Sequence, residues 1–187
     1  MHAEKGLAKN SLRLIERGNT MKIRTEKTGD REAVHSVNVS AFKTSDEADL
    51  VDILREQAQP VVSLVAEDKK QIVGHIMFSP VSLSGQPDLK VIGLAPMSVL
   101  PAFQQKGIGS ALVRSGVEQC RQLGFVAVVV LGHPDYYPRF GFLPSSQFKI
   151  DSEYDVPEDV FMAMELVPGS LNGKTGRIKY HQAFSNL

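Results

Sequence analysis

The sequence predicts an α/β domain in which helices cover both faces of a mixed β-sheet. The first observation is the order of apolar patterns along the chain: a strand, two helices, three strands, a helix and then further strands. The second is the composition, because 187 residues with 42% hydrophobic side chains bury a sizeable core, and no shift in composition marks a second domain.

The first third of the chain predicts one strand and two helices. Residues 22–26 form a short apolar run, and residues 30–42 follow it with apolar side chains on one helical face. Thr44 and Glu47 have the spacing of a capping box, which predicts the start of a second helix. Pro60 then ends that helix.

The middle of the chain predicts a hairpin and a third strand. Runs rich in β-branched residues at 61–66 and 72–81 are separated by a polar turn, which is the pattern of two paired strands. A turn near Gly85 leads into a strand over 91–99.

The remaining elements follow from the same patterns. Residues 107–123 predict a helix and residues 125–131 a buried strand. Residues 144–159 are polar and predict a loop, residues 160–167 predict a late strand, and residues 177–184 predict a short strand or strap.

The charge balance excludes some classes of partner. Lys and Arg together number 21, as do Asp and Glu, so a nucleic-acid or anionic-membrane binder with a general basic excess is disfavoured. Cys120 is the single cysteine, so no internal disulfide forms, and its place on the apolar helical stripe predicts a buried side chain. No apolar run is long enough for a signal peptide or a membrane span, so we expect a cytoplasmic protein.

The most informative segment is a glycine loop between a strand and a helix. Gln104, Gly107 and Gly109 form the pattern Q-x-x-G-x-G, and the loop opens a helix whose free N–H groups favour an anion. The third glycine of a dinucleotide fingerprint and the Walker lysine are both missing, which disfavours a nucleotide-binding domain. The loop therefore predicts a phosphate or pyrophosphate site of another kind.

Two motifs together resemble those of the GNAT N-acetyltransferase superfamily. The glycine loop resembles its coenzyme A pyrophosphate loop, and Tyr137, Gly141 and Phe142 resemble its Y-x-x-x-G-F motif. The segment from Leu131 to Phe142 is most similar to the YhbS-like subgroup. The resemblance implies a GNAT domain over 21–167, with a mostly antiparallel sheet that is splayed at the cofactor slot. Residues 1–20 are then expected to be a flexible extension, and 168–187 a C-terminal extension packed on the domain.

The resemblance also implies how acetyl-CoA is bound. Backbone N–H groups of the loop bind the pyrophosphate, and the edge of the preceding strand pairs with the pantetheine arm and polarises the thioester carbonyl. The residues implied in cofactor binding are Met97, Ser98, Val99, Gln104, Gln105, Lys106, Gly107, Ile108, Gly109 and Ser110. Tyr137 is the expected general acid, since a phenol protonates the departing thiolate.

The general base is left open by the sequence. The strand over 91–99 contains no carboxylate, so we take Glu67 as the tentative base, with His133 and Asp135 as alternatives. A chain of water molecules or an already neutral amine would make a dedicated base unnecessary. His75 lies within a strand and is expected to be structural, and Arg139 contacts the cofactor or an acidic substrate, or is simply exposed.

The expected function is transfer of an acetyl group from acetyl-CoA to a primary amine of a small molecule or a protein. The alternative is an acyl-CoA-binding sensor with little or no catalysis. Residues 30–58 and 144–159 are expected to line the acceptor side of the cleft. We expect a monomer or homodimer, with no metal and no nucleic-acid or membrane partner.

Overall fold

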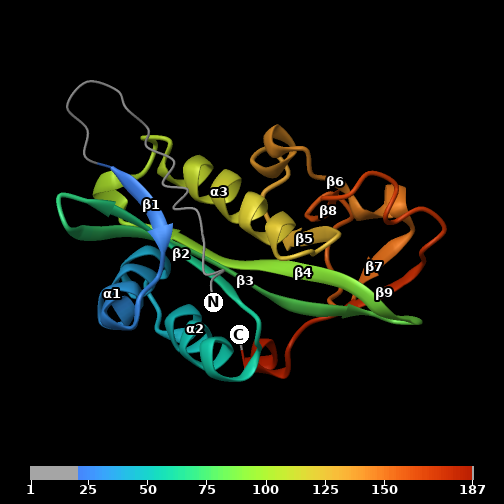
Figure 1. Ribbon diagram of the computed structural model, residues 1–187, viewed down its shortest axis with the longest axis horizontal. Coiled ribbons are helices and arrows are strands. Elements are labelled where there is room, and N and C mark those ends of the chain that lie inside the picture. The colour runs from blue at the N-terminus through green and yellow to red at the C-terminus, as the bar shows by residue number, and fades with distance from the viewer. Residues whose placement is uncertain (1–20, 187) are drawn as a thin grey trace, which may run out of the picture.

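The computed structural model describes residues 21–186, so the predicted extension at 1–20 lies outside the described residues. The predicted architecture is confirmed: a nine-stranded sheet in the described part of the chain carries α3 on one face and α1 and α2 on the other (Figure 1). The bounds of the helices are α1 Arg31–Phe42, α2 Asp46–Gln57 and α3 Ile108–Gln122. The bounds of the strands are β1 Lys22–Thr25, β2 Val62–Asp68, β3 Gln71–Leu83, β4 Gln86–Val99, β5 Ala127–Leu131, β6 Leu143–Pro144, β7 Ile150–Ser152, β8 Phe161–Glu165 and β9 Gly176–Lys179.

The sheet is mostly antiparallel. Its main path runs β1-β2-β3-β4-β5-β8-β6, and β9 pairs with both β3 and β7. Only the β4–β5 and β7–β9 pairs are parallel among the described strands. The β4–β5 ladder joins Val91–Leu94 to Ala127–Val130 and stops there, although β4 continues to Val99. The second half of β4 therefore pairs with β3 alone, which is the splay that the family resemblance implied.

The three helices pack through two different buried clusters. The cluster beneath α3 includes Leu112, Val117 and Cys120, so the prediction of a buried Cys120 is confirmed. Burial raises the pKa of this thiol to about 12, which keeps it protonated at neutral pH. The cluster beneath α1 and α2 includes Val51 and Leu54, and belongs to the other face of the sheet.

Gly116 sets how closely α3 approaches the sheet. A methyl group at this position would lie 2.2 Å from Cε2 of Phe78, which is fully buried on β3. Two atoms cannot share that space, so the absence of a side chain at 116 lets the helix rest on the Phe78 ring. This contact fixes the height of α3, and with it the position of the loop at its N-terminus.

The start of α2 differs from the predicted capping box. The helix begins at Asp46 with Ser45 as its N-cap, so Glu47 is one position too early to reach back as a box requires. The Thr44 hydroxyl instead lies 3.0 Å from a Glu47 carboxylate oxygen, to which it donates a hydrogen bond. This bond orients the Glu47 side chain rather than capping the helix.

The segments after residue 142 contain more structure than the sequence predicts. Residues 144–159 were expected to form a loop, but they include the end of β6, a 3₁₀ helix over Ser145–Phe148 and β7. Farther along, β9 pairs with β3 at Ser82 and Leu83, and a 3₁₀ helix over Gln182–Asn186 contacts α2 (Figure 1). Ala183 and Phe184 of that helix share the buried cluster of α1 and α2.

Candidate functional site

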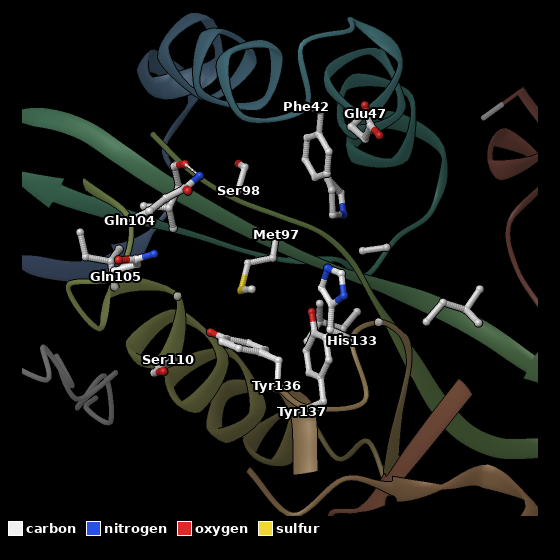
Figure 2. A pocket seen from close by; sticks show the side chains of 18 of the residues that line it. Phe42, Glu47, Met97, Ser98, Gln104, Gln105, Ser110, His133, Tyr136 and Tyr137 are labelled. Atoms are coloured by element: carbon white, nitrogen blue, oxygen red, sulfur yellow. Dashed lines mark hydrogen bonds between the residues drawn. The ribbon is translucent and has the colours of Figure 1, made fainter. Parts of the chain in front are cut away.

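A pocket of ≈ 790 Å³ opens where β4 leaves β5, and three parts of the chain surround it (Figure 2). The first part is the glycine loop with the start of α3. The second is the turn over 131–139 after β5, and the third is a helical wall, which consists of Phe42, Glu47 and Leu50 from α1 and α2. The floor is the second half of β4, residues 94–99, which pairs with β3 but leaves β5 after Leu94. The predicted residues Met97, Ser98 and Val99 all line the pocket.

The glycine loop adopts backbone conformations that few residue types tolerate. Gly107 has φ +80° and is the N-cap of α3, and Gln105 has φ +60°. The Gln104 amide donates a hydrogen bond to the Val99 carbonyl oxygen at 3.0 Å, which ties the loop to the end of β4. The sequence pattern therefore serves two purposes here, since glutamine anchors the loop and Gly107 supplies the left-handed turn.

The N-terminus of α3 presents free N–H groups to the pocket. The first intrahelical bond runs from the Ala111 N–H to the Gly107 carbonyl, so the N–H groups of Ile108, Gly109 and Ser110 precede the helical ladder. A methyl group at position 109 would lie 2.8 Å from the Tyr136 hydroxyl oxygen. These free donors and the helix dipole favour an anion at this position, and the pyrophosphate site that the sequence predicts there stays a prediction.

Lys106 is the residue of the 104–110 loop that does not line the pocket. Its ammonium donates to the Ala102 carbonyl oxygen at 2.8 Å and lies 5.1 Å from the centroid of the Phe103 ring. The side chain is thus folded back on the preceding turn. A contact with the cofactor through its backbone N–H stays a prediction.

The turn after β5 carries an aromatic cluster into the pocket. Tyr137 packs edge-on against Tyr136 and Phe142, with ring centroids 5.2 and 5.6 Å away. Its ring is buried, and burial raises the pKa of its phenol well above the ordinary value. Figure 2 shows the hydroxyl of Tyr137 and the ring of His133 pointing into the pocket. A protonated phenol therefore faces the place where β4 and β5 diverge.

Arg139 and Tyr136 form a stacked pair on the same turn. The Arg139 guanidinium lies 4.6 Å from the Tyr136 ring centroid and donates to the Asp135 carbonyl oxygen at 3.0 Å. Because the Tyr136 hydroxyl lies beside Gly109, this pair belongs to the glycine-loop side of the pocket. Of the alternatives left open for Arg139, contact with the cofactor is the one that this position favours.

Glu67 and Asp135 do not line the pocket. The Glu67 carboxylate accepts a hydrogen bond at 2.6 Å from Arg24, whose guanidinium also bonds Asp30 at 2.6 Å. The Glu67 side chain is thus engaged at the β1–β2 edge of the sheet and lies outside the lining of the pocket, a position that gives no support to the expectation that Glu67 is the base. Among the three residues considered for the base, the structure brings only His133 to the site.

His75 is buried in a polar network on the α1 side of the sheet. Its Nε2 lies 2.9 Å from the Ser63 hydroxyl, and its Nδ1 lies 3.2 Å from the Asn38 amide. Burial, together with a smaller contribution from the charge of Arg55, lowers the pKa of His75 to about 3. The carboxylate of Glu26 lies 4.0 Å away, but it pairs with Arg55 at 2.7 Å, so it does not reverse this effect. The neutral imidazole is structural, as expected.

The helical wall was only partly foreseen from the sequence. Residues 30–58 were expected at the acceptor side, and this stretch supplies Phe42, Glu47 and Leu50. Residues 144–159 were expected there too, but none of them lines the pocket, because they pair with β8 and β9 at the far end of the sheet. The sequence did contain a signal: Phe42 is an aromatic residue at the end of one predicted helix, and five positions later Glu47 is a carboxylate at the start of the next.

No group of three or more His, Cys, Asp or Glu side chains in residues 21–186 has the arrangement of a metal site. Over the same residues, no helix has the length and apolar character needed to cross a bilayer.

Comparisons with known proteins agree with this geometry. The model of the acetyltransferase (GNAT) family matches residues 31–142. An uncharacterized N-acetyltransferase of Escherichia coli, YhbS, is 34% identical over 168 residues, which cover 89% of this chain and all of YhbS. A second one from that bacterium, YjhQ, is 40% identical over 134 residues, covering 70% of this chain and 74% of YjhQ.

Two solved structures are similar over nearly the whole chain. The E. coli YhbS crystal structure, in complex with CoA, has a TM-score of 0.85 at 32% identity and covers 91% of this chain and 95% of its own. A GNAT family acetyltransferase from Brucella melitensis, in complex with acetyl-CoA, has a TM-score of 0.73 at 36% identity and covers 88% and 97%. By its sequence motifs, its fold and these relatives, the chain belongs to the GNAT family of N-acetyltransferases.

Proposed function

We propose that this protein transfers the acetyl group of acetyl-CoA to a primary amine by direct attack within a ternary complex. The observation that carries the proposal is that one pocket contains a helix N-terminus suited to an anion, the edge of β4 that β5 leaves unpaired, and a buried phenol. The relatives named above that were solved with CoA or acetyl-CoA support this choice of donor. The thioester of the bound donor would supply an activated acetyl group.

The residues present fit a coenzyme A ester. The N–H groups at the start of α3 and the turn from Gln105 to Ser110 would hold the pyrophosphate, with Gly107 and Gly109 leaving the backbone accessible. The free edge of Met97, Ser98 and Val99 would pair with the pantetheine amides, as a partner strand would. An N–H group on this edge would also polarise the thioester carbonyl.

Tyr137 is the proposed general acid. Attack by the amine nitrogen forms a C–N bond at the carbonyl carbon, and collapse of the tetrahedral intermediate breaks the C–S bond. Tyr137 would give its phenolic proton to the sulfur as the thiolate leaves, and it would be reprotonated from solvent. The raised pKa of the buried phenol keeps that proton in place until the thiolate forms.

His133 is the proposed base, since it lines the pocket and Glu67 and Asp135 do not. An imidazole is the side chain that most readily takes up a proton near neutral pH. It would accept the proton that the amine nitrogen loses as the amide forms. His133 is exposed, so the proton passes on to solvent without a further relay.

The proposal is tested by ligand binding and turnover together. Acetyl-CoA and CoA should raise the unfolding temperature and ATP should not, with roughly 2.7 kcal/mol of stabilisation at 100 times the dissociation constant. Tyr137→Phe should lower kcat about 100-fold while the dissociation constant of acetyl-CoA is unchanged. Stabilisation by ATP but not by CoA would refute the donor site. Tight acetyl-CoA binding without thiol release for any amine would instead indicate a sensor.

A further inference from the structure

The helical wall contains the only carboxylate among the described residues that line the pocket. Glu47 is half-buried, and one of its oxygens accepts the hydrogen bond from Thr44 at 3.0 Å. No other described residue forms a hydrogen bond or ion pair with it. Its carboxylate therefore has remaining capacity to accept hydrogen bonds from a ligand in the pocket.

Helix polarity alone does not explain Glu47. Acidic residues are favoured in the first turn of any helix, and Asp46 and Asp49 of α2 satisfy that preference as well as Glu47 does. Asp46 and Asp49 are exposed and do not line the pocket, and Asp49 faces His35 at 3.4 Å. Only Glu47 turns its negative charge toward the pocket, where it attracts a cation.

The rest of the helical wall is apolar. Phe42 is 37% exposed, so its ring lies open at the pocket, and Leu50 is buried beside it. Figure 2 shows Phe42 projecting from the end of α1 toward Met97 and His133, with Glu47 next to it. A ligand that covers this ring gains the burial of an aromatic surface close to the carboxylate.

A second polar group at the pocket, the Ser98 hydroxyl, has no hydrogen-bond partner among the described residues. Ser98 is 3% exposed, and its hydroxyl forms no hydrogen bond with any described residue. Ser98 is the register partner of His75, so both side chains point to the face of the sheet on which Asn38 of α1 contacts His75. The Ser98 hydroxyl thus lies on the side of the pocket that carries the helical wall, and a buried hydroxyl without a partner favours a ligand group that bonds it.

The positive group of the pocket is on the opposite side. Arg139 is stacked on Tyr136 beside Gly109, and its guanidinium already bonds the Asp135 carbonyl. Next to the helical wall there is no lysine or arginine among the described lining residues to balance an acidic group of a ligand. A carboxylate beside the amine of the acceptor would therefore be repelled by Glu47, with no positive side chain near the helical wall to offset the repulsion.

We propose that the acceptor is a small amphiphilic amine, in which an ammonium group pairs with Glu47 and an apolar aryl or alkyl body without an adjacent acidic group covers Phe42 and Leu50. This inference rests on the proposed function for the identity of the reaction, but it concerns binding at a different wall. Glu47 is a specificity-determining residue here, and Tyr137 keeps its role as the acid. The bound ammonium group gives one proton to solvent through the exposed His133 before its nitrogen attacks, and His133 accepts the second proton as the amide forms. The Ser98 hydroxyl accepts a further hydrogen bond from the same ammonium group.

The test uses three amines that differ by one feature each. 2-Phenylethylamine has the charge and the ring, phenylalanine adds a carboxylate, and propylamine lacks the ring. Calorimetric titration into the CoA-saturated protein measures amine binding without turnover, and thiol release from acetyl-CoA measures KM and kcat. We expect 2-phenylethylamine to bind at least about tenfold more tightly than the other two amines, the scale of one charged or aromatic contact.

Matched variants separate the charge at position 47 from charge in general. Glu47→Gln should weaken the binding of 2-phenylethylamine about tenfold and reduce the preference for it over phenylalanine. Asp46→Asn removes the same charge from the same helical turn, and it should change neither the affinity nor the preference. Phe42→Ala should remove the preference for 2-phenylethylamine over propylamine. The affinity for acetyl-CoA should stay constant in all three variants, which also shows that they fold.

Failures of the two proposals look different. If the wild type does not bind acetyl-CoA, or releases no thiol with any amine, the proposed reaction is refuted. Equal binding of phenylalanine and 2-phenylethylamine, no binding of 2-phenylethylamine, or an unchanged affinity in Glu47→Gln overturns the inference about the acceptor. Efficient acetylation of a lysine-containing peptide in place of the small amines also overturns it.

Discussion

The ring of Tyr137 lies in the space that a side chain at Gly132 would need: a methyl group there would be 2.1 Å from Tyr137 Cε2. We therefore expect Gly132→Ala to displace the proposed general acid and lower kcat about tenfold or more, because a shift of about 1 Å at a reacting group has that scale of effect. Steady-state thiol release measures it. Gly29→Ala is the matched control, since no atom would lie within 4 Å of its methyl group. Full activity of Gly132→Ala would mean that the ring position is irrelevant.

The pH dependence of kcat should reflect the burial of Tyr137. Burial, with a smaller contribution from Tyr136, raises the pKa of its phenol above the ordinary 10.0. The acid form is the active one, so turnover should not fall through loss of the Tyr137 proton at any pH below about 10. Profiles of kcat for the wild type and Tyr137→Phe check this. An alkaline fall below that pH that disappears in the variant would contradict the raised pKa.

The two glycines of the loop should respond differently to alanine. Gly107 has φ +80°, so an alanine there carries roughly 1–2 kcal/mol of backbone strain, whereas Gly109 is helical and its methyl group would meet only the movable end of Tyr136. We expect Gly107→Ala to weaken acetyl-CoA binding about tenfold and Gly109→Ala to have a much smaller effect. Calorimetry on both variants measures this. Equal losses would show that strain is not the deciding factor.

Gly116→Ala should destabilise the protein although alanine favours helices. The gain in helix propensity is about 1 kcal/mol, but overpacking against Phe78 costs about 1–3 kcal/mol in a rigid core. Urea unfolding measures the net loss of unfolding free energy. The double variant Gly116→Ala/Phe78→Leu should lose less unfolding free energy than the sum of the losses in the two single variants, because the smaller leucine makes room for the methyl group. Strict additivity would argue against the contact.

Stability should fall in mild acid because of His75. Its pKa is about 3 in the folded protein against 6.5 ordinarily, so the unfolded chain binds a proton that the folded one does not. The contribution is complete above pH 6.5 and is lost as the pH falls toward 3. Protonation of Asp30 reduces stability only below its ordinary pKa of 3.8, because the hydrogen bond from Arg24 lowers the pKa of this carboxyl in the folded protein. In urea unfolding, His75→Gln should have a lower unfolding free energy near pH 7. Its unfolding free energy should also depend less on pH than that of the wild type, down to about pH 5. Equal slopes of unfolding free energy against pH in the two proteins would exclude His75 as the cause of the acid destabilisation.

The parts of the fold that the sequence predicts are those with local signals. The glycine loop and α3 follow from Gly107, from Pro101 before it and from a helical apolar stripe, each of which acts within a few residues. The splay of β4 came from the family resemblance and agrees with the ladder that ends at Leu94. Tyr137 reached the pocket because its spacing to Gly141 fixes one compact turn.

The parts that the sequence misses depend on distant contacts. β6 and β7 are two and three residues long, and they exist because β8 and β9 pair with them. Glu67 lies outside the lining of the pocket and is bound by Arg24 of the neighbouring strand, which no local pattern reveals. The role of Glu47 is likewise visible only once the pocket places Phe42 and Leu50 next to it.

The separation of the two buried clusters has a consequence for how this enzyme diversifies. The glycine loop rests on the cluster beneath α3, whereas the helical wall rests on the cluster of α1, α2 and the last 3₁₀ helix, which includes Phe184. We therefore expect substitutions in the second cluster to change which amine binds without weakening the binding of the donor. Directed evolution toward a new amine therefore has its best targets around α2 and the chain terminus that supports it, and a library confined to those positions should retain donor affinity throughout.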